Sequence, residues 1–464
     1  MRTYPSNTLS RFAVAACLLA VALSGCGREL AAPDTSVQIT RSTATTKPVV
    51  LRPYSQGPPK TNTAGLLSFD DAVATALERS AELQAALARV HAALADARQA
   101  RLLPNPVLSA VVRFPEGGGQ AVIEAGLSAE LLAFLQRPRA ISAADHRLRA
   151  ASSEALTAAL DIVTEVKESY ARVQALEAEA LVLDDRRRIL DRLLELARAR
   201  VEVGESSRLD VIVLDVLRAE FNAEAIQTAT EIRDERLKLA RLIGQPHSNA
   251  EWKLKAWQPP AEIVGDQGTW VAVALQRRPE VQAHIWELAA LGDEAAATKL
   301  ALFDGGEVGV EGEREEGWSV GPSVSVPLPV FDWGQARRQK AEARVIEARH
   351  KLVQAKREVV EEVRRTWEAL ASARRATDTI RSESIPAQER RRAQVESAYR
   401  NGLADITAVL LAEQDLQASQ SKLIESEKNT SLALARLERA VGGAGVAAEL
   451  QFPTTRPTTQ AVAR

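Results

Sequence analysis

The segment VATALERSAELQA at residues 73–85 returns as VAVALQRRPEVQA at residues 271–283, which is 198 positions later. Gly204 and Gly402 are separated by the same 198 positions, far downstream of the first match. Matches that recur at one offset indicate an internal repeat, and this unit is too long for a solenoid repeat. The sequence therefore predicts a body that is built twice.

A further match lies between these two and has an offset of 197, since Val166 corresponds to Val363. We place the first repeat at residues 66–246 and the second at residues 268–443. Residues 247–267 form the linker between them. A length of 464 residues thus predicts one duplicated body in place of three separate globular domains.

The sequence pattern of each repeat predicts the same order of elements: a helix, a pair of strands, a long helix, a tight turn and another helix. In the first repeat the helices cover about residues 69–101, 140–201 and 209–243. Apolar residues follow heptad seams along them, as in long antiparallel helical hairpins.

Apolar and polar residues alternate over four short segments, which predicts four strands. The strands cover about residues 107–114, 120–128, 306–313 and 318–328. Each has one apolar face and one face of small or polar residues. Trp318 and Trp333 flank the last strand, where the interfacial aromatic residues of a membrane barrel lie.

The composition excludes several classes of function. A formal net charge of -2 provides no field that would gather nucleic acid. Only 4% of the residues are aromatic, and one Met and two Cys leave no disulfide framework and no soft-metal site. Rich Ala, Leu, Arg and Glu content is typical of long helices.

No motif for catalysis is present in the sequence. The five histidines are scattered, without metal-ligand spacing and without a Cys partner: His91, His146, His247, His284 and His350. No glycine-rich phosphate loop follows a predicted strand. We therefore predict that the protein is not an enzyme and has no cofactor and no metal site.

The N-terminus predicts export. Arg2 and Arg11 precede an apolar run at residues 12–23, which is too short to span a bilayer. Small residues lead into Cys26, as in a bacterial lipobox, so residues 1–25 are expected to be a lipoprotein signal peptide. Cys26 would then carry the lipid, with acyl chains such as palmitate.

The segments that flank the repeats carry no periodic pattern. Residues 26–65 are rich in Thr, Pro and Ser and predict an extended tether behind the lipidated cysteine. Residues 444–464 predict a disordered C-terminal tail. Gly27 stands where an Asp would favour inner-membrane retention, so we expect sorting to the outer membrane.

The strands predict assembly with other copies of the chain. An open four-stranded sheet cannot sit in lipid, because the N–H and C=O groups of its edges would be unpaired. Two copies would give eight strands, whose interior side chains fill the barrel, whereas three would give twelve and leave a water-filled lumen. We therefore predict a homotrimer.

Several motifs resemble those of the TolC-like outer-membrane efflux factors, over essentially the whole mature body. The motifs are LLPNP at residues 102–106, VPLPVFDWG at 326–334, RVEVGESSRLDV at 200–211 and YRNGLADI at 399–406. The first leans toward the heavy-metal cation efflux branch. The resemblance implies a mainly α fold whose trimer forms a 12-strand membrane β-barrel, continued by a periplasmic α-barrel.

The resemblance also implies partners and sites. The partners are a periplasmic membrane-fusion adaptor, an inner-membrane resistance-nodulation-division-type pump and outer-membrane lipid. Eight residues fall on the tips that would meet the adaptor: Val203, Gly204, Glu205, Ser206, Asn401, Gly402, Leu403 and Ala404.

The gate of such channels is only partly matched by this sequence. Tyr399 and Asp210 occupy the positions of a latch that holds the aperture shut. An arginine of the family is Ala404 here, and its pair of aperture acids falls on Ala408 and Leu411. A different acidic constriction could come from three other residues: Glu205, Asp405 and Glu413.

Two other functions fit the same sequence. The chain could be the exit duct of a type I protein secretion system, which would use the same body with another pump. It could also be a non-channel lipoprotein that scaffolds the envelope through coiled coils. The cargo, whether metal cations or drugs, is left open by the sequence.

Overall fold

The computed structural model describes residues 34–52, 65–114, 116, 120–204, 207–247, 249–259, 265–303, 305–314 and 317–451. The chain divides into two compact units. Of the described residues, unit 1 contains 90–149 and 286–349, and unit 2 contains 34–89, 150–285 and 350–451.

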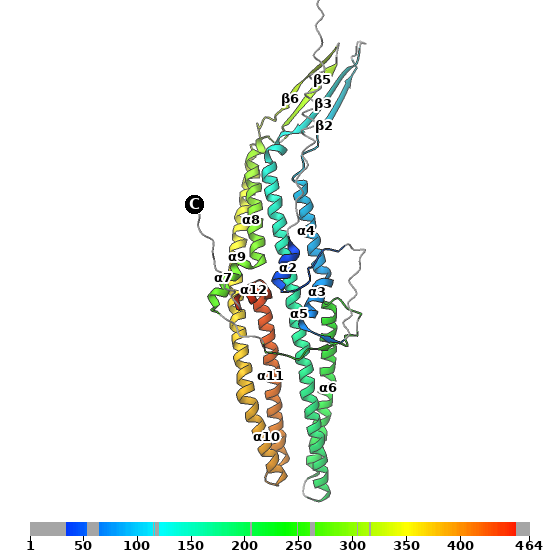
Figure 1. Cartoon of the computed structure of the whole chain (residues 1–464), viewed down its shortest axis with the longest axis vertical. Helices are drawn as coiled ribbons and strands as arrows, with labels where there is room; N and C mark the ends of the chain where they lie inside the picture. Colours follow the sequence, from blue (N-terminus) through cyan, green and yellow to red (C-terminus); the bar gives the residue numbers. More distant parts are fainter. Residues whose placement is uncertain are drawn as a thin grey trace, which may run out of the picture. The chain divides into compact units, whose positions relative to one another are not determined.

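Both repeats fold into the same order of elements (Figure 1). The first repeat contains the helices α3 (Phe69–Arg79), α4 (Ala81–Gln99), α5 (Leu131–Glu202) and α6 (Arg208–Leu242). The second contains α7 (Gln267–Arg277), α8 (Pro279–Ala297), η1 (Thr298–Phe303), α9 (Gln335–Thr379), η2 (Ile380–Ser384), α10 (Ile385–Arg400) and α11 (Ile406–Val441). The predicted duplicated and mainly helical fold is confirmed.

Among the described residues, no helix is both long enough and apolar enough to cross a membrane.

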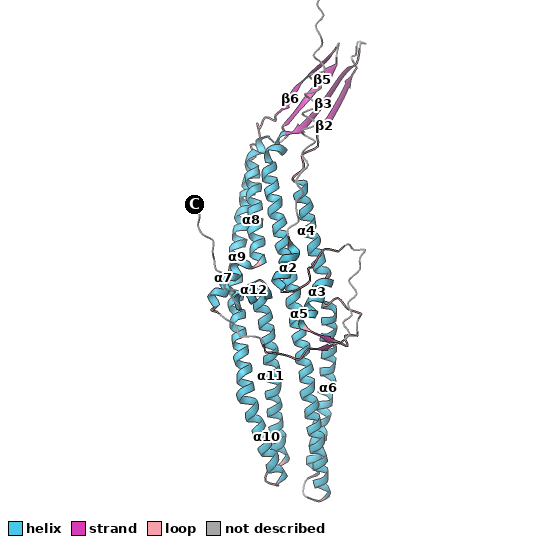
Figure 2. Cartoon of the chain, in the orientation of Figure 1, coloured by secondary structure: helices cyan, strands magenta, loops and turns pink. Residues whose placement is uncertain are grey.

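Unit 1 contains a sheet of four antiparallel strands, drawn in magenta in Figure 2. The strands are β2 (Val107–Arg113), β3 (Val122–Glu130), β5 (Glu307–Arg314) and β6 (Trp318–Ser325). Their order is β2-β3-β5-β6, so each repeat supplies one hairpin and the two hairpins pair through β3 and β5. The four predicted strands are therefore confirmed.

The helix predicted over residues 69–101 is broken at Ser80, which corrects the sequence-based prediction. Ser80 has an extended ψ of 121°, and its hydroxyl accepts a hydrogen bond of 3.2 Å from the N–H of Leu83. This hydroxyl begins α4 as a cap, in competition with a continuous helix. In the second repeat, Pro279 imposes the same break on Arg278.

A one-residue difference between the repeats has a visible structural cause. The offset is 197 at Tyr170 and Trp367 but 198 at Gly204 and Gly402. The second repeat thus has one extra residue between Trp367 and Gly402, and the π-helix η2 lies in that stretch. A π-helical turn holds one more residue than an α-helical turn, so η2 absorbs the insertion.

Unit 2 contains one apolar core for each repeat. In the first, Tyr170 of α5 packs edge-on against Phe69 of α3, with ring centroids 5.6 Å apart. In the second, Trp367 of α9 packs against Trp270 of α7 at 5.3 Å. The repeat equivalents Tyr170 and Trp367 therefore occupy the same place in their cores.

The tether prediction is wrong for part of residues 26–65. Residues Thr35–Thr43 form the helix α2, and the Ile39 side chain is fully buried in the core of the first repeat. Asp34 caps this helix by accepting a hydrogen bond of 3.2 Å from the N–H of Val37. A single buried apolar residue gives no periodic pattern, so the sequence carried no signal for α2.

The C-terminal prediction also needs correction, because residues Ala444–Gln451 form the helix α12. Ala447 is buried in the core of the second repeat, and Glu449 accepts hydrogen bonds from Arg41 of α2. A Cβ on Gly443 would come within 2.2 Å of the Ser42 carbonyl oxygen, so this close approach of α12 to α2 requires glycine. Residues 452–464 lie outside the described residues.

The predicted linker contains the short strand β4 (Lys253–Leu254), which pairs in parallel with β1 (Leu66–Leu67). The Tyr170 hydroxyl donates a hydrogen bond of 3.0 Å to the Leu67 carbonyl and accepts one of 3.0 Å from the Lys255 N–H. One buried hydroxyl thus holds both strands against α5. Burial raises the pKa of Tyr170 above its ordinary value, so the hydroxyl stays protonated as this donor.

We predict that Tyr170→Phe destabilises the protein by about 1–3 kcal/mol, because it removes both hydrogen bonds of the buried hydroxyl and leaves the Leu67 carbonyl and the Lys255 N–H only their mutual hydrogen bond of 3.4 Å. The measurement is the thermal unfolding of the detergent-solubilised protein by circular dichroism. Tyr399→Phe is the matched control, since the buried Tyr399 hydroxyl has no hydrogen-bond partner among the described residues. Equal losses in the two variants would contradict the bridging role of Tyr170.

Candidate functional site

The sheet of unit 1 has two chemically different faces. Side chains alternate along each strand, and the register aligns the apolar residues of neighbouring strands on one face and the polar residues on the other. One face is almost wholly apolar along all four strands. It contains Leu108, Ala110, Val112, Ile123, Ala125, Leu127, Ala129, Val308, Val310, Val320, Pro322 and Val324, and Arg314 at the end of β5 is its one charged residue. Leu108 is 76% exposed and Val320 is 68% exposed, so this large apolar surface is uncovered in the single chain.

The other face is mostly polar and acidic, with Val107, Val111 and Val122 as its apolar residues. It contains five glutamates, Glu124, Glu130, Glu307, Glu311 and Glu313, and the serines Ser109, Ser128, Ser319, Ser323 and Ser325. The one basic residue on it is Arg113, which forms an ion pair with Glu124 at 2.8 Å. An apolar face opposite an acidic one is the arrangement of a strand that has lipid on one side and water on the other.

The second helix tip is a Schellman turn that the sequence of residues 399–406 dictates. The N–H of Leu403 donates to the Ala398 carbonyl at 2.8 Å, and the N–H of Gly402 donates to the Tyr399 carbonyl at 3.0 Å. Gly402 has a φ of +71°, a left-handed conformation that glycine adopts without cost. Asp405 then caps α11 through the N–H of Ala408 at 2.9 Å, and this hydrogen bond lowers the pKa of Asp405.

The first tip has the same plan. Gly204 follows α5 with a φ of +80°, and the Ser207 hydroxyl caps α6 by accepting from the Leu209 N–H at 3.1 Å. Glu205 and Ser206, which we predict to be docking residues, lie outside the described residues. Cys26, the predicted lipidation site, also lies outside them.

Each tip exposes a large apolar side chain beside its glycine. Val203 is 70% exposed at the first tip and Leu403 is 82% exposed at the second. Asn401 is exposed as well, and its side-chain amide donates to the Ser397 carbonyl at 2.9 Å. Ala404 instead packs against the apolar cluster behind the tips.

This cluster brings the two helical hairpins of unit 2 together. It consists of Leu190, Leu194, Ala197, Leu214, Phe221, Tyr399, Ile406 and Val409, from α5, α6, α10 and α11. The Tyr399 side chain is only 3% exposed, and the Arg200 guanidinium lies 4.9 Å from its ring centroid. Because the Tyr399 hydroxyl has no hydrogen-bond partner among the described residues, its bond to Asp210 is not formed in this structure.

Glu413, one of the acids considered for a constriction, lies on α11 behind the tips. Its carboxylate is 3.5 Å from the Arg392 guanidinium, and its side chain is largely buried. Burial raises the pKa of Glu413 above its ordinary value, the nearby Glu396 adds to this effect, and Arg392 opposes it. Arg186 and Arg192 also face this carboxylate and lower its pKa.

A group of charged residues in unit 1 has no counterpart in the sequence analysis. Arg139 of α5 donates to Asp293 of α8 at 2.8 Å, and His146 lies 3.6 Å from the same carboxylate. Burial opposes the charged form of Asp293, yet hydrogen bonds from Ser142 and Arg139 keep its pKa below the ordinary value. Only the packing of α5 against α8 brings these residues together, so their sequence spacing carries no signal.

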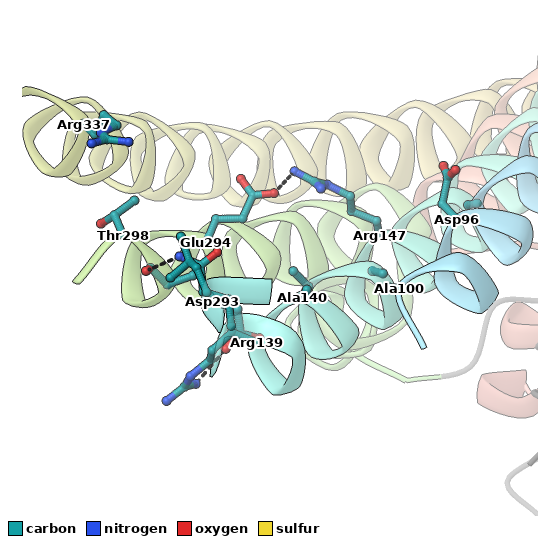
Figure 3. A pocket seen from close by; sticks show the side chains of 15 residues that line it. Asp96, Ala100, Arg139, Ala140, Arg147, Asp293, Glu294, Thr298 and Arg337 are labelled. Atoms are coloured by element: carbon teal, nitrogen blue, oxygen red, sulfur yellow. Dashed lines mark hydrogen bonds and ion pairs between the residues drawn. The ribbon is translucent and has the colours of Figure 1, made fainter. Parts of the chain in front are cut away.

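A cavity of about 590 Å³ lies beside this group, lined by α4, α5, α8, η1 and α9 (Figure 3). Its charged lining residues are three acids and three arginines: Asp96, Asp293, Glu294, Arg139, Arg147 and Arg337. Because these charges balance, the cavity selects no ligand by its charge. Within the described ranges, no three His, Cys, Asp or Glu side chains gather in a way that could hold a metal ion.

The sequence matches the model of a family described as "Outer membrane efflux protein", over residues 72–245 and 270–443. No curated protein matches the sequence. Solved structures do match, with identities that make them evidence of fold alone.

Three of these structures illustrate the likeness. The outer membrane protein VceC from Vibrio cholerae has 21% identity and a TM-score of 0.69, and the match covers 81% of this chain and 96% of VceC. The outer-membrane channel OprN has 20% identity and a TM-score of 0.68, covering 90% and 99%. The open state of the Neisseria gonorrhoeae outer membrane channel MtrE has 19% identity and a TM-score of 0.66, covering 81% and 89%.

We predict that Glu413→Gln stabilises the protein at pH 7 and has little effect at pH 4. A carboxyl whose folded pKa is raised contributes stability at acid pH, and this contribution is lost as the pH rises through the folded pKa. The neutral glutamine removes that loss. The measurement is the midpoint of thermal unfolding at both pH values, and an equal shift at the two would contradict the assignment.

Proposed function

Since the chain belongs to the outer membrane efflux protein family, we propose that three copies of it assemble into one exit duct through the outer membrane. Membership makes the protein an outer-membrane efflux channel component. We propose in addition that the channel is a trimer, that it has the partners and the lipid anchor described below, and that it carries a particular class of cargo.

The observation that carries the trimer is the two-faced sheet with two open edges. β2 and β6 have no strand partner on their outer sides among the described residues. In lipid, these edge N–H and C=O groups need partners, which β6 of one copy and β2 of the next would provide. Three copies supply twelve strands, enough to enclose a lumen, whereas the eight strands of two copies would be filled by side chains.

The faces of the sheet support the same arrangement. The apolar face would contact lipid, and the face with five glutamates would line the water-filled lumen. Trp318, at one end of β6, is exposed on the lipid-facing side, where tryptophan favours the membrane interface. A lumen of this charge favours cationic cargo, so we propose metal cations or organic cations as the transported class.

The tips support docking to a periplasmic adaptor that connects the duct to an inner-membrane pump of the resistance-nodulation-division type. Val203 and Leu403 are large apolar side chains exposed beside the two tip glycines. Such residues are costly to leave in water and favour a protein partner. We propose that the eight tip residues named from the sequence form this contact.

The N-terminal lipid on Cys26 would add a second attachment to the outer membrane. Helix α2 supports this role, because its buried Ile39, 13 positions after the cysteine, fixes the chain to unit 2. A pull on the anchor would therefore be transmitted to the body through α2.

We propose that the closed aperture forms when the Tyr399 hydroxyl bonds to Asp210. The structure supplies a buried hydroxyl that has no hydrogen-bond partner among the described residues and would gain one in this state. A buried hydroxyl without a partner costs about 1–3 kcal/mol, which favours the latched state when the carboxylate is within reach.

The purified protein in planar lipid bilayers tests the channel function. We expect stable single-channel steps from a trimeric species, with the cross-linked mass of three chains. A monomeric protein without conductance would contradict the proposal. The growth of a deletion strain on divalent cations and on organic drugs identifies the cargo class.

The acidic face predicts cation selectivity. Replacing Glu124, Glu311 and Glu313 together by Gln should lower the ratio of cation to anion permeability, because the lumen loses charge without losing size. The measurement is the reversal potential across a potassium chloride gradient. Ser323→Ala is the matched control on the same face, and an equal change in both variants would contradict the lumen assignment.

The latch predicts that Asp210→Ala combined with Tyr399→Phe raises the single-channel conductance, because the aperture loses its closing bond. Glu220→Ala is the control, since Glu220 is an exposed acid on the same helix as Asp210. Unchanged conductance in the double variant would remove the latch assignment.

A further inference from the structure

The duplication supplies a template for contacts between copies of the chain. Within one chain, α5 of the first repeat packs against α8 of the second, and Arg147 of α5 forms an ion pair with Glu294 of α8. Figure 3 shows this pair as a dashed line between the two helices. In a ring of three duplicated chains, α9 of one copy meets α4 of the next in the same relation, because α9 is the repeat equivalent of α5 and α4 that of α8.

The correspondence of residues across this step is fixed by the helices themselves. Helices α4 (Ala81–Gln99) and α8 (Pro279–Ala297) are both 19 residues long and differ by 198 positions throughout. Helices α5 and α9 are unbroken from their starts through Tyr170 and Trp367, where the offset is 197. An unbroken helix keeps its offset, since an inserted residue would need a bulge.

Applied to the template pair, these offsets give Arg344 for Arg147 and Asp96 for Glu294. The charge of each partner is therefore retained. In the single chain, both Arg344 and Asp96 are exposed. Neither forms an ion pair with another residue of the described chain, and Asp96 has no dashed line in Figure 3.

We propose that Arg344 of one copy forms an ion pair with Asp96 of the next, and that α9 packs on the neighbouring α4 as α5 packs on α8. The partner is thus a second copy of this chain. This inference rests on the proposed trimer and names the helix faces and the side chains that meet in it.

The second ion pair between α5 and α8, Arg139–Asp293, supports the correspondence, because neither of its charges is present at the equivalent positions of α9 and α4. Arg139 and Asp293 correspond to Ala336 and Ala95, so both charges are replaced together. Loss of only one would have left an uncompensated charge in the contact, which is costly when it is buried. The two positions thus behave as partners across the α9–α4 contact as they do across the α5–α8 contact.

An aromatic group in the α5–α8 contact also differs on both sides from its counterpart in the α9–α4 contact. Trp286 of α8 stacks on His146 at 5.6 Å, and the Arg149 guanidinium lies 4.6 Å from the Trp286 ring centroid. The counterpart of Trp286 is Ala88, and the counterpart of Arg149 is Ile346, which is 54% exposed in the single chain.

The counterpart of His146 is Ala343, so aliphatic residues replace an aromatic and charged group on both sides of the contact. On α4, Ala88, Ala92 and Ala95 are all exposed. Their spacing of four and three residues puts them on one helix face. A face of alanines allows another helix to approach closely, and Ile346 on the neighbouring copy would then be covered.

Thiol cross-linking tests the contact. The variant with both Asp96→Cys and Arg344→Cys, treated in membranes with a short bifunctional thiol reagent, should give dimers and trimers on a denaturing gel. Each single variant should give only the monomer. The unmodified chain, with Cys17 and Cys26 as its only cysteines, is the background control.

Charge exchange tests the ion pair itself. Arg344→Asp and Asp96→Arg should each lower the temperature at which the detergent-solubilised trimer dissociates, and the two together should restore most of the loss. Arg349→Glu is the matched control, because Arg349 is exposed on the same helix but lies about 140° further round it. It should leave the dissociation temperature unchanged.

The two proposals fail in different ways. If the unmodified chain is trimeric but the double cysteine variant does not cross-link, or the exchanged charges do not restore stability, the Arg344–Asp96 contact is wrong and the trimer stands. If the unmodified chain is monomeric in the membrane, the proposed assembly itself is overturned.

Discussion

The constraint on which the rest of the structure depends is the pairing of backbone groups at the edges of a four-stranded sheet. The apolar face of the sheet cannot remain in water, and its edges β2 and β6 cannot remain unpaired in lipid. In the proposed assembly, closure of the sheet with other copies of the chain meets both conditions. The acidic face would then turn inward, and the duplicated helices would follow the symmetry of the strands.

The duplication distributes the stability of unit 2 over two similar apolar cores and several ion pairs that connect the repeats, among them Lys167–Glu438 and Arg436–Glu168. Arg439 of α11 is largely buried and donates to Asp161 of α5 at 2.6 Å and to Glu280 of α8. It therefore ties a helix of the first repeat to the second. Loss of either acid would leave a buried guanidinium without one of its partners, which costs more than an exposed ion pair contributes.

The sequence predicted those parts of the fold that depend on local periodicity. The strands followed from alternation, the helical hairpins from heptads, and the tips from glycines that tolerate a positive φ. It could not predict α2, because Ile39 is buried in a core that other helices supply, and one buried apolar residue leaves no periodic pattern in the sequence. The Arg139–Asp293 contact and the raised pKa of Glu413 were missed for the same reason, since both arise from tertiary packing.

The second helical hairpin changes its chemistry along its length. Near α7, the contact between α9 and α11 is apolar, with Val363 and Leu437 both fully buried. Further toward the tip it becomes a cluster of hydroxyls, in which Thr377 lies 2.9 Å from the Ser426 hydroxyl and 3.3 Å from that of Thr430.

The π-helix η2 begins three residues after Thr377, and beyond it the exposed pairs Arg381–Glu427 and Arg391–Asp415 continue the contact. Exposed ion pairs contribute little and are screened by salt, whereas buried apolar side chains contribute about 1.5–3 kcal/mol each. The stretch just beyond η2 is therefore held more weakly than the repeat core and than the apolar cluster of Tyr399, Ile406 and Val409 behind the tips. In the proposed duct, this polar stretch would let the tip of the hairpin move while the apolar contacts at both of its ends stay packed.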